Sequence, residues 1–301
     1  MNYNLITILG PTAVGKTRLG ALLASHFDGE IISADSRQVY RRMDIGTGKD
    51  LTDFDVEGKI IPYHLIDIIE PEEEFNLFTF NKQFYHTYRN IISRNKIPFL
   101  VGGTGMYLHS VLSGYDLNKV EFEESKYEEL NKQTIEVLQE KLKGLNQSLH
   151  NTTDLLIKDR VIKAILIAEK NKHESIEEKI KINSLVIGIK LERQKVKERI
   201  TSRLKLRLEN GMIEEVKNLL DSGLSYEKLD FFGLEYKYIS KFLKQEISYE
   251  EMFEKLNIAI HQFSKRQMTW FRKMEREGLK INWIEVADFN SAEQIILKKY
   301  F

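Results

Sequence analysis

The sequence of 301 residues predicts an α/β protein, in which a parallel sheet is flanked by helices and carries a smaller helical insertion domain. The first observation is that short apolar runs ending at Gly or Asp alternate with helical patterns, which is typical of a parallel sheet covered on both faces. The second is that all four prolines lie among the first hundred residues, together with most of these runs. The rest of the chain is therefore expected to be mainly helical.

Four apolar runs are expected to form strands: "NLITIL" (4–9), "EIISA" (30–34), "IPFLVGG" (97–103) and "SLVIGIKL" (184–191). Ligands of such sheets bind at the carboxyl ends of the strands. The loop at Gly10, the acid at Asp35 and the turn at Gly102 and Gly103 all follow predicted strands. We therefore expect these three places to share one cleft.

A phosphate-binding motif follows the first run. It fits G-x-x-x-x-G-K-[ST] between a strand-like and a helical segment, and consists of Gly10, Pro11, Thr12, Ala13, Val14, Gly15, Lys16 and Thr17. The glycines let backbone amides turn toward phosphate oxygens, Lys16 adds a positive charge, and the Thr17 hydroxyl can ligate Mg²⁺. The sheet is thus expected to be of the P-loop type and to bind a nucleotide, ATP included, or another phosphate compound.

Two polar residues are expected beside this loop. Asp35, at the end of the second predicted strand, can ligate a metal, accept a proton or hydrogen-bond an amine. One alternative is a ribose-binding acid, which the missing G-x-G-x-x-G argues against, and another is a helix N-cap formed by Asp35 or Ser36. Thr104 in "VGGTGMYL" either offers its hydroxyl to the same cleft or caps the helix that follows.

A helical insertion is expected between about 116 and 180. Its segment "YEELNKQTIEVLQEKLKGL" has apolar residues near helical spacing, namely Tyr127, Leu130, Leu138, Leu142 and Leu145. The predicted domains are thus 1–115 with 181–301, which form the core and its C-terminal helices, and 116–180. Long amphipathic helices are expected from Glu192 to Leu220 and from 249 to 277.

Charge is informative only locally. The 45 basic and 45 acidic residues balance, so the whole chain indicates no polyanionic partner, but eight basic residues stand between Lys190 and Arg207. Here Arg199, Arg203 and Arg207 recur every four residues and form one helical stripe, which is either a solvated face or faces an anion. Farther on, "FSKRQMTWFRKMERE" mixes basic and aromatic side chains, which suits RNA, although a helix with Trp270 in the core fits nearly as well.

Several classes of protein and site are excluded. Without cysteine the chain has no disulfide, thiolate zinc site or cysteine nucleophile, and its seven histidines form no His-x-x-x-His pair. Any metal is expected to be an oxygen-bound ion that arrives with a phosphate. No apolar run approaches the length of a membrane helix, and the first residues resemble a strand more than a signal peptide, so we expect a cytoplasmic protein without membrane contact.

Six blocks of the sequence, in order and at these separations, closely resemble the bacterial tRNA dimethylallyltransferase family, also called tRNA isopentenyltransferases: "GPTAVGKT", "ISADSRQVYRRMDIGTGK", "VGGTGMYL", "RITSRLKLRLENGMIEEV", "GLEYKYI" and "SKRQMTWFR". The resemblance covers nearly the whole chain. It implies an enzyme that transfers a dimethylallyl group from dimethylallyl diphosphate to N6 of the adenosine 3′-adjacent to the anticodon in tRNA, releasing diphosphate. Mg²⁺ is the implied cofactor, and we expect a monomer.

The resemblance also implies roles for single residues. The phosphate loop is implied to bind the leaving diphosphate, and Arg203 matches the arginine that faces this diphosphate. Asp35 matches the aspartate that accepts the amine proton. Thr104 matches the hydroxyl that orients the reacting groups. The insertion is implied to clamp the anticodon stem, and the C-terminal basic block to contact phosphates. The residues expected at tRNA are Asp35, Ser36, Arg37, Gln38, Arg160, Lys163, Lys265, Arg266 and Arg272.

The sequence departs from the commoner family pattern in two places. In "NTTDLLIKDRVIKAI", Thr153-Asp154 replaces an Asn-Asp pair, and Lys163 stands at an arginine position, which keeps the charge but loses the bidentate geometry. At residues 46–50, "GTGKD" replaces the more usual "GTAKP".

Two other functions stay open at this point. A small-molecule or nucleoside kinase shares the phosphate loop, the strand-end aspartate and the arginine-rich helix, and would transfer a phosphoryl group from ATP. A nucleotide-gated RNA-binding protein would hydrolyse a nucleoside triphosphate, but the second acidic strand expected of such switches is not evident in the sequence.

Overall fold

The computed structural model describes residues 3–115, 124–145, 158–170 and 180–301. The chain divides into two compact units. The larger comprises Met1–Tyr115 and Lys181–Phe301, and the smaller comprises Asp116–Ile180.

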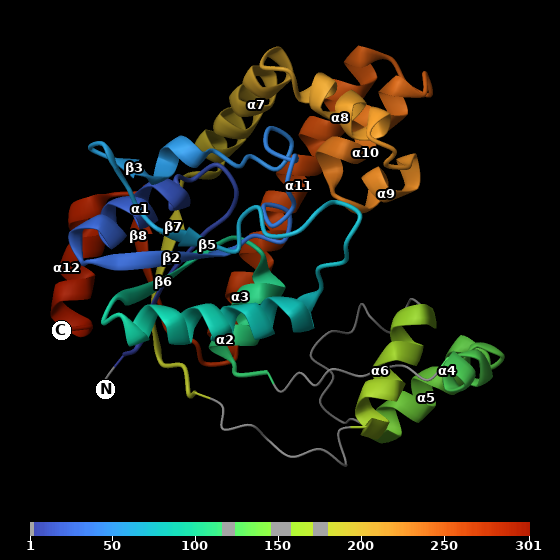
Figure 1. Cartoon of the computed structure of the whole chain (residues 1–301), viewed down its shortest axis with the longest axis horizontal. Coiled ribbons are helices and arrows are strands. Elements are labelled where there is room, and N and C mark those ends of the chain that lie inside the picture. The colour runs from blue at the N-terminus through green and yellow to red at the C-terminus, as the bar shows by residue number, and fades with distance from the viewer. Residues whose placement is uncertain (1–2, 116–123, 146–157, 171–179) are drawn as a thin grey trace. The chain divides into compact units, whose positions relative to one another are not determined.

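The larger unit is built on a six-stranded parallel sheet with the strand order β5-β2-β6-β1-β7-β8 (Figure 1). Its strands are β1 (Leu5–Leu9), β2 (Gly29–Ala34), β5 (Tyr63–His64), β6 (Ile97–Gly102), β7 (Ser184–Lys190) and β8 (Ile281–Glu285). The four predicted strands are confirmed as β1, β2, β6 and β7. The edge strands β5 and β8 were not predicted. Two further short strands, β3 (Asp55–Val56) and β4 (Lys59–Ile60), form a separate antiparallel hairpin.

Helices cover both faces of this sheet, with α1 and α12 on one face and α2 and α3 on the other (Figure 1). The helices of this unit are α1 (Lys16–His26), α2 (Leu77–Ser93), α3 (Gly105–Leu112), α7 (Arg193–Glu209), α8 (Met212–Asp221), α9 (Tyr226–Phe231), α10 (Leu234–Leu243), α11 (Tyr249–Arg276) and α12 (Phe289–Lys299), with a 3₁₀ turn, η1 (Leu51–Phe54). Among the described residues, no helix has the length and apolar character needed to span a membrane.

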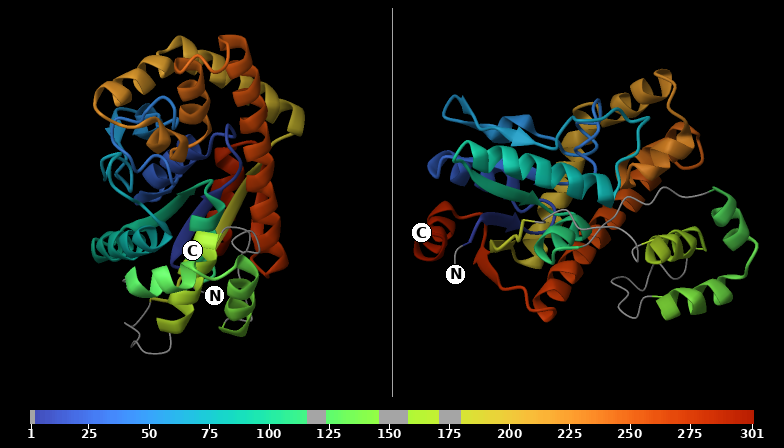
Figure 2. Two further views of the ribbon diagram at one scale, coloured as in Figure 1. Left: turned by 90° about the vertical axis from the view of Figure 1, so that its right-hand side faces the viewer. Right: turned by 60° about the horizontal axis from the view of Figure 1, so that its bottom comes forward.

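The 28-residue helix α11 contacts α3, α7 and α10 (Figure 2). It starts with a capping box, in which the Ser248 hydroxyl accepts from the Glu251 N–H and the Glu251 carboxylate accepts from the Ser248 N–H. Its buried positions recur at intervals of three or four residues and form one face: Met252, Leu256, Ala259, Ile260, Ser264, Gln267, Phe271 and Met274. Two of these positions are polar, and one of them reaches the site described below.

The carboxyl ends of the central strands are aligned. Gly102 of β6 is in register with both Ala34 of β2 and Leu9 of β1. A Cβ atom at Gly102 would lie 2.4 Å from the carbonyl oxygen of Ala34, so only glycine permits this approach of the two chains. The residues that follow each strand therefore emerge side by side, as the sequence predicts.

The smaller unit contains three helices, α4 (Glu124–Asn131), α5 (Ile135–Leu145) and α6 (Lys158–Lys170). They enclose a core of their own, to which Tyr127 and Leu145 are partly buried contributors and whose buried members are Leu130, Leu138, Leu142, Val161, Ile162, Ile165 and Leu166. The predicted helical spacing of the insertion is thus confirmed in the described residues. Thr153 and Asp154 lie outside them.

Candidate active site

The phosphate loop connects β1 to α1 at the carboxyl edge of the sheet. Ala13 has a φ of 65° and Gly15 a φ of 89°, so the loop takes two left-handed residues to turn into the helix. Gly10 lies against β7, where a Cβ atom would be 2.8 Å from the carbonyl oxygen of Ile189. The Lys16 ammonium donates to the Pro11 carbonyl at 2.7 Å, which folds its side chain back over the loop.

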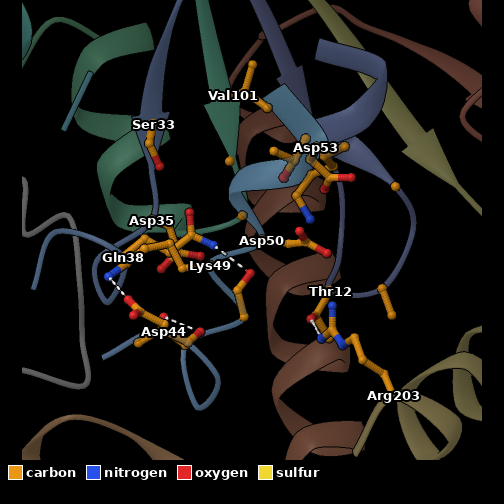
Figure 3. Close-up of a pocket in the computed structure, with 18 of the residues that line it drawn as sticks. Thr12, Ser33, Asp35, Gln38, Asp44, Lys49, Asp50, Asp53, Val101 and Arg203 are labelled. Carbon is orange, nitrogen blue, oxygen red and sulfur yellow. Dashed lines mark hydrogen bonds and ion pairs between the residues drawn. The ribbon is translucent and has the colours of Figure 1, made fainter. Parts of the chain in front are cut away.

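Two cavities meet at this loop. The first, of about 400 Å³, extends from the loop toward Gln38, Gly48 and Asp53 (Figure 3). The second, of about 320 Å³, extends toward α10 and α11 and has aromatic walls from Phe232, Tyr236 and Phe263. Their shared lining consists of Thr12, Lys16, Asp35, Thr47, Gly103, Arg203 and Arg207. The cleft predicted at the strand ends is thus present, with Asp35 where its two parts join.

Asp35 and Thr104 are positioned by short local contacts. The Asp35 Oδ1 accepts the Arg37 N–H at 2.9 Å, whereas its Oδ2 has no hydrogen bond to a described residue. The Thr104 hydroxyl accepts the Ser36 N–H at 3.0 Å, and the Thr104 N–H donates to the Ala34 carbonyl at 3.1 Å. These bonds join the turns that follow β2 and β6.

Of the capping alternatives considered for these residues, the one for Asp35 or Ser36 is wrong, and the one for Thr104 is confirmed in position only. No helix follows Asp35 or Ser36. Thr104 occupies the N-cap position of α3, but its hydroxyl makes no capping bond there. Its oxygen is committed to Ser36 instead.

Besides Lys49, which is ion-paired, and Arg266, four cations line the two cavities: Lys16, Arg37, Arg203 and Arg207. Burial, and then the charge of Arg203, lower the pKa of Lys16 to about 8, with Asp35 opposing. Burial, and then Arg207, lower the pKa of Arg203 to about 10. Among the described residues, no carboxylate lies within 4.0 Å of any of the four. The cleft therefore holds positive charge that its own side chains leave uncompensated.

Asp35 and Glu235 are the two carboxylates whose charges act on Arg37, Arg203 and Arg207 alike. Burial raises the pKa of Glu235, while Arg207 and Arg203 oppose that rise. Even with the five lining carboxylates all ionised (Asp35, Asp44, Asp50, Asp53 and Glu235), the six lining cations leave the two cavities with a net positive charge. Such a site attracts a multiply charged anion.

Gln267 of α11 ties the phosphate loop to the turn after β6. Its Oε1 accepts the Thr12 N–H at 2.8 Å, and its Nε2 donates to the Gly103 carbonyl at 2.9 Å. The Arg203 guanidinium donates to the Thr12 hydroxyl, so α7 holds the same residue of the loop (Figure 3). Gln267 was not among the predicted site residues, although it is polar on the apolar face of an amphipathic helix.

Glu215 of α8 holds the loop 44–49, which closes the first cavity. Its carboxylate accepts three backbone N–H groups, those of Asp44 at 2.8 Å, Ile45 at 2.7 Å and Gly46 at 2.9 Å. The Tyr236 hydroxyl donates to the same carboxylate at 2.7 Å. On the other side of the loop, the buried Lys49 ammonium is paired with Asp44 and Asp67. Glu215 was also missed in the sequence.

The predicted tRNA-binding residues fall into separate places. Ser36, Arg37 and Arg266 line the second cavity, whereas Gln38 lines the first and donates to the Gly48 carbonyl at 3.2 Å. Lys265 and Arg272 line a groove of about 550 Å³ between α7 and α11. The structure thus does not bring the C-terminal basic residues into one patch.

Other basic and aromatic residues are also placed. Arg160 and Lys163 belong to α6 of the smaller unit, where Lys163 pairs with Asp159 at 3.0 Å and the Arg160 side chain lies outside the described residues. Trp270 packs over Gly105 of α3, where a Cβ atom would lie 2.5 Å from its indole ring. This packing favours the core interpretation of Trp270 over base stacking.

Oxygen donors suited to Mg²⁺ line the first cavity. Thr17 stands at the start of α1, and Asp35, Asp50 and Asp53 line the same space. Among the described residues, no group of three or more His, Asp or Glu side chains is arranged to hold a metal by itself. If Mg²⁺ were to arrive with a phosphate compound, the Thr17 hydroxyl is the group that would hold it here, beside these carboxylates.

Comparison with known proteins gives a consistent result. The family profile described as IPP transferase matches residues 38–274. The chain is 50% identical over 295 residues to tRNA dimethylallyltransferase 1 of Geotalea daltonii, covering 98% of this chain and 95% of the relative. It is 52% identical over 287 residues to tRNA dimethylallyltransferase 2 of Phocaeicola vulgatus, covering 95% and 93%.

Solved structures agree with these relatives. The full-length tRNA isopentenylpyrophosphate transferase of Bacillus halodurans superposes with a TM-score of 0.70 at 32% identity, over 99% of this chain and 94% of that one. A eukaryotic dimethylallyltransferase acting on tRNA has a TM-score of 0.77 at 22% identity, over 98% and 78%, and supports the fold alone. Since the profile spans most of the chain and the relatives are aligned nearly end to end, the chain belongs to the IPP transferase family.

Proposed function

We propose that this protein transfers a dimethylallyl group from dimethylallyl diphosphate to N6 of the adenosine 3′-adjacent to the anticodon in tRNA. One structural observation carries the proposal beyond family membership. A cleft with four unpaired cations contains, where its two cavities join, a carboxylate with a free oxygen. Such a cleft suits a reaction that expels a diphosphate and removes a proton from the incoming nucleophile.

The first cavity is proposed to hold the diphosphate. The C1–O bond of the allylic donor breaks as its electron pair leaves with the diphosphate, so negative charge grows on the leaving oxygen. Lys16, Arg203 and the amides of the phosphate loop face that space and would stabilise this charge. Mg²⁺ held through Thr17, when bound, would add a further positive charge to the same oxygens.

The second cavity is proposed to receive the adenine, with its aromatic walls in contact with the base. The base must leave its stack to reach the cleft. N6 is a weak nucleophile because its lone pair is delocalised into the ring. As its bond to C1 of the prenyl group forms, the Oδ2 atom of Asp35 is free to accept the N6 proton, while Thr104 and Ser36 hold the turn that carries Asp35.

The tRNA body is proposed to contact surfaces beyond the cleft. Arg37 and Arg266 line the second cavity and are suited to phosphates or to the flanking nucleotides. We infer that the helical insertion contributes contacts to the anticodon stem through Arg160 and Lys163.

A direct assay tests the proposal. Purified protein is incubated with Mg²⁺, dimethylallyl diphosphate and unmodified tRNA, and digested nucleosides are analysed by mass spectrometry. A dimethylallyl group on the adenosine next to the anticodon is expected. A parallel reaction with ATP in place of the prenyl donor tests the kinase alternative, which family membership does not favour. Phosphoryl transfer from ATP, together with no prenylated adenosine in the first reaction, would overturn the proposal.

A further inference from the structure

Arg207 lies beside Arg203 at the cleft but does not make the contacts that Arg203 makes. It stands one helical turn farther along α7, is half-buried, and lines both cavities. Whereas Arg203 donates to the Thr12 hydroxyl, Arg207 has no hydrogen bond and no ion pair with a described residue. A guanidinium has five N–H donors, so these remain available to a ligand.

The side chain of Arg207 is seated on Gly48. A Cβ atom at position 48 would lie 1.7 Å from one terminal nitrogen of the guanidinium and 2.7 Å from its central carbon. Any residue other than glycine would therefore force the guanidinium to another position. Gly48 is one of the two residues, with Asp50, at which "GTGKD" departs from the more usual "GTAKP" of the family.

The loop beneath Arg207 has little freedom to move away. The Gly48 N–H donates to the Ile45 carbonyl at 3.1 Å, and the Gly48 carbonyl accepts from Gln38 at 3.2 Å. Glu215 binds the N–H groups of residues 44 to 46, and the ammonium of Lys49 is buried between Asp44 and Asp67. Since the loop is fixed on both sides of Gly48, a clash at this position would displace the arginine.

Two guanidiniums one turn apart repel each other. Burial also disfavours the charged form of Arg207, which lowers the pKa of this group, while Glu235 opposes the effect. This arrangement is stabilised when an anion with several oxygens lies between the two arginines. The phosphate loop faces the same cavity.

We propose that Arg207, seated by Gly48, is a second guanidinium ligand of the prenyl donor's diphosphate, acting beside Arg203. The inference rests on the proposed function, because it assigns the same donor to the first cavity. It adds a residue that binds the prenyl donor, and the position of this residue depends on a glycine in a different segment of the chain.

The first test compares Arg207→Met with Arg199→Met. Arg199 lies on the same helix and in the same predicted stripe, but is exposed and lines neither cavity, so it is the matched control. For Arg207→Met we expect a tenfold to hundredfold weaker affinity for inorganic diphosphate with Mg²⁺, and a similar rise in KM for dimethylallyl diphosphate. A loss of this size corresponds to about one or two charged hydrogen bonds. The KM for tRNA should not change. Arg207→Lys should fall between the two because it keeps the charge without the fork.

The second test is a double-mutant cycle with Gly48→Ala. Alanine at φ 68° is strained in every background, so a cycle is needed to isolate its effect on Arg207. In the otherwise unchanged protein, Gly48→Ala should weaken diphosphate binding by displacing the guanidinium. In the Arg207→Met background the same change should have little further effect.

The outcomes separate the inference from the proposed function. If Arg207→Met raised only the KM for tRNA, or if the two changes were additive in the cycle, the inference would be overturned. If the unchanged protein bound diphosphate through Arg207 but prenylated no adenosine, the proposed function would fail while the diphosphate-binding role of Arg207 stood.

Discussion

Gln267 and Thr12 are 255 positions apart in sequence, yet the side-chain oxygen of Gln267 accepts the backbone N–H of Thr12 at 2.8 Å. The same amide donates to the Gly103 carbonyl at 2.9 Å. One buried side chain of α11 thus fixes the phosphate loop and the turn after β6 at a set separation. The distance between the diphosphate site and the turn that carries Thr104 therefore depends on a helix whose other lining residues, such as Phe263 and Arg266, belong to the second cavity.

Gln267→Leu is expected to lower both stability and turnover. It leaves the Thr12 N–H and the Gly103 carbonyl without partners, at about 1–3 kcal/mol for each buried group. Thermal unfolding should show a lower Tm, and single-turnover kinetics a slower chemical step. The control is Gln262→Leu, an exposed position of the same helix, which should unfold like the unchanged protein. Equal effects of the two changes would show that the bonds of Gln267 do not matter.

Asp35→Ala is expected to reduce turnover by about 10²–10⁴-fold, the usual contribution of a general base. Diphosphate binding should survive, because the Asp35 carboxylate does not attract the diphosphate anion. Single-turnover prenylation and calorimetric titration with diphosphate separate the two effects. Near-normal turnover would remove the assignment of Asp35 as the base.

The strands and the cleft could be predicted because their signals are local. An apolar run followed by glycine or aspartate predicts both a strand and the residue at its carboxyl end, and the phosphate loop, Asp35 and Gly103 indeed line one cavity. The edge strands lack this signal. β5 has only two residues. β8 is buried only at Ile281 and Ile284, and it lies in a part of the chain that was predicted to be mainly helical.

The basic stripe shows where sequence spacing stops being informative. Each step of four residues advances about 40° around a helix, so Arg199 and Arg207 differ by about 80°. Arg203 and Arg207 reach the cleft, whereas Arg199 points to solvent. Gln267 and Glu215 were missed for another reason, since their partners are backbone groups of distant segments, and no local pattern records those contacts.

Arg203→Ala is expected to weaken use of the prenyl donor at unchanged tRNA affinity. The guanidinium holds the Thr12 hydroxyl and faces the first cavity, so its loss should raise the KM for dimethylallyl diphosphate and lower kcat. Steady-state kinetics with each substrate varied in turn, with exposed Lys205→Ala as the control, distinguishes the substrates. If only tRNA binding were weakened, Arg203 would be a ligand of the tRNA and not of the prenyl donor.

Glu215→Gln is expected to loosen the loop 44–49. A carboxylate accepts three N–H groups and the Tyr236 hydroxyl here, whereas an amide has one acceptor oxygen and would direct its own NH₂ group at backbone donors. The Tm should fall, and diphosphate affinity should fall with it. Glu214→Gln alters the neighbouring exposed carboxylate and should leave both unchanged. Hydrogen exchange of the residue 44–46 amides gives a direct readout, and unchanged protection would contradict this role of Glu215.

Diphosphate affinity is expected to fall as the pH rises through about 8, because the pKa of Lys16 is lowered to about 8 in the unliganded cleft. Below that pH the ammonium is charged and attracts the anion; above it, binding must include the uptake of a proton. Since diphosphate also titrates, the informative quantity is the ratio of the Kd of Lys16→Arg to that of the unchanged protein, measured by calorimetry from pH about 6.5 to about 9.5, a window that lies on both sides of the lowered pKa of about 8 and below the ordinary lysine value. Arginine keeps its charge throughout, so the ratio should decrease with increasing pH. A constant ratio would mean that Lys16 stays protonated over this range, and that neither the burial of Lys16 nor the charge of Arg203 lowers its pKa into this range.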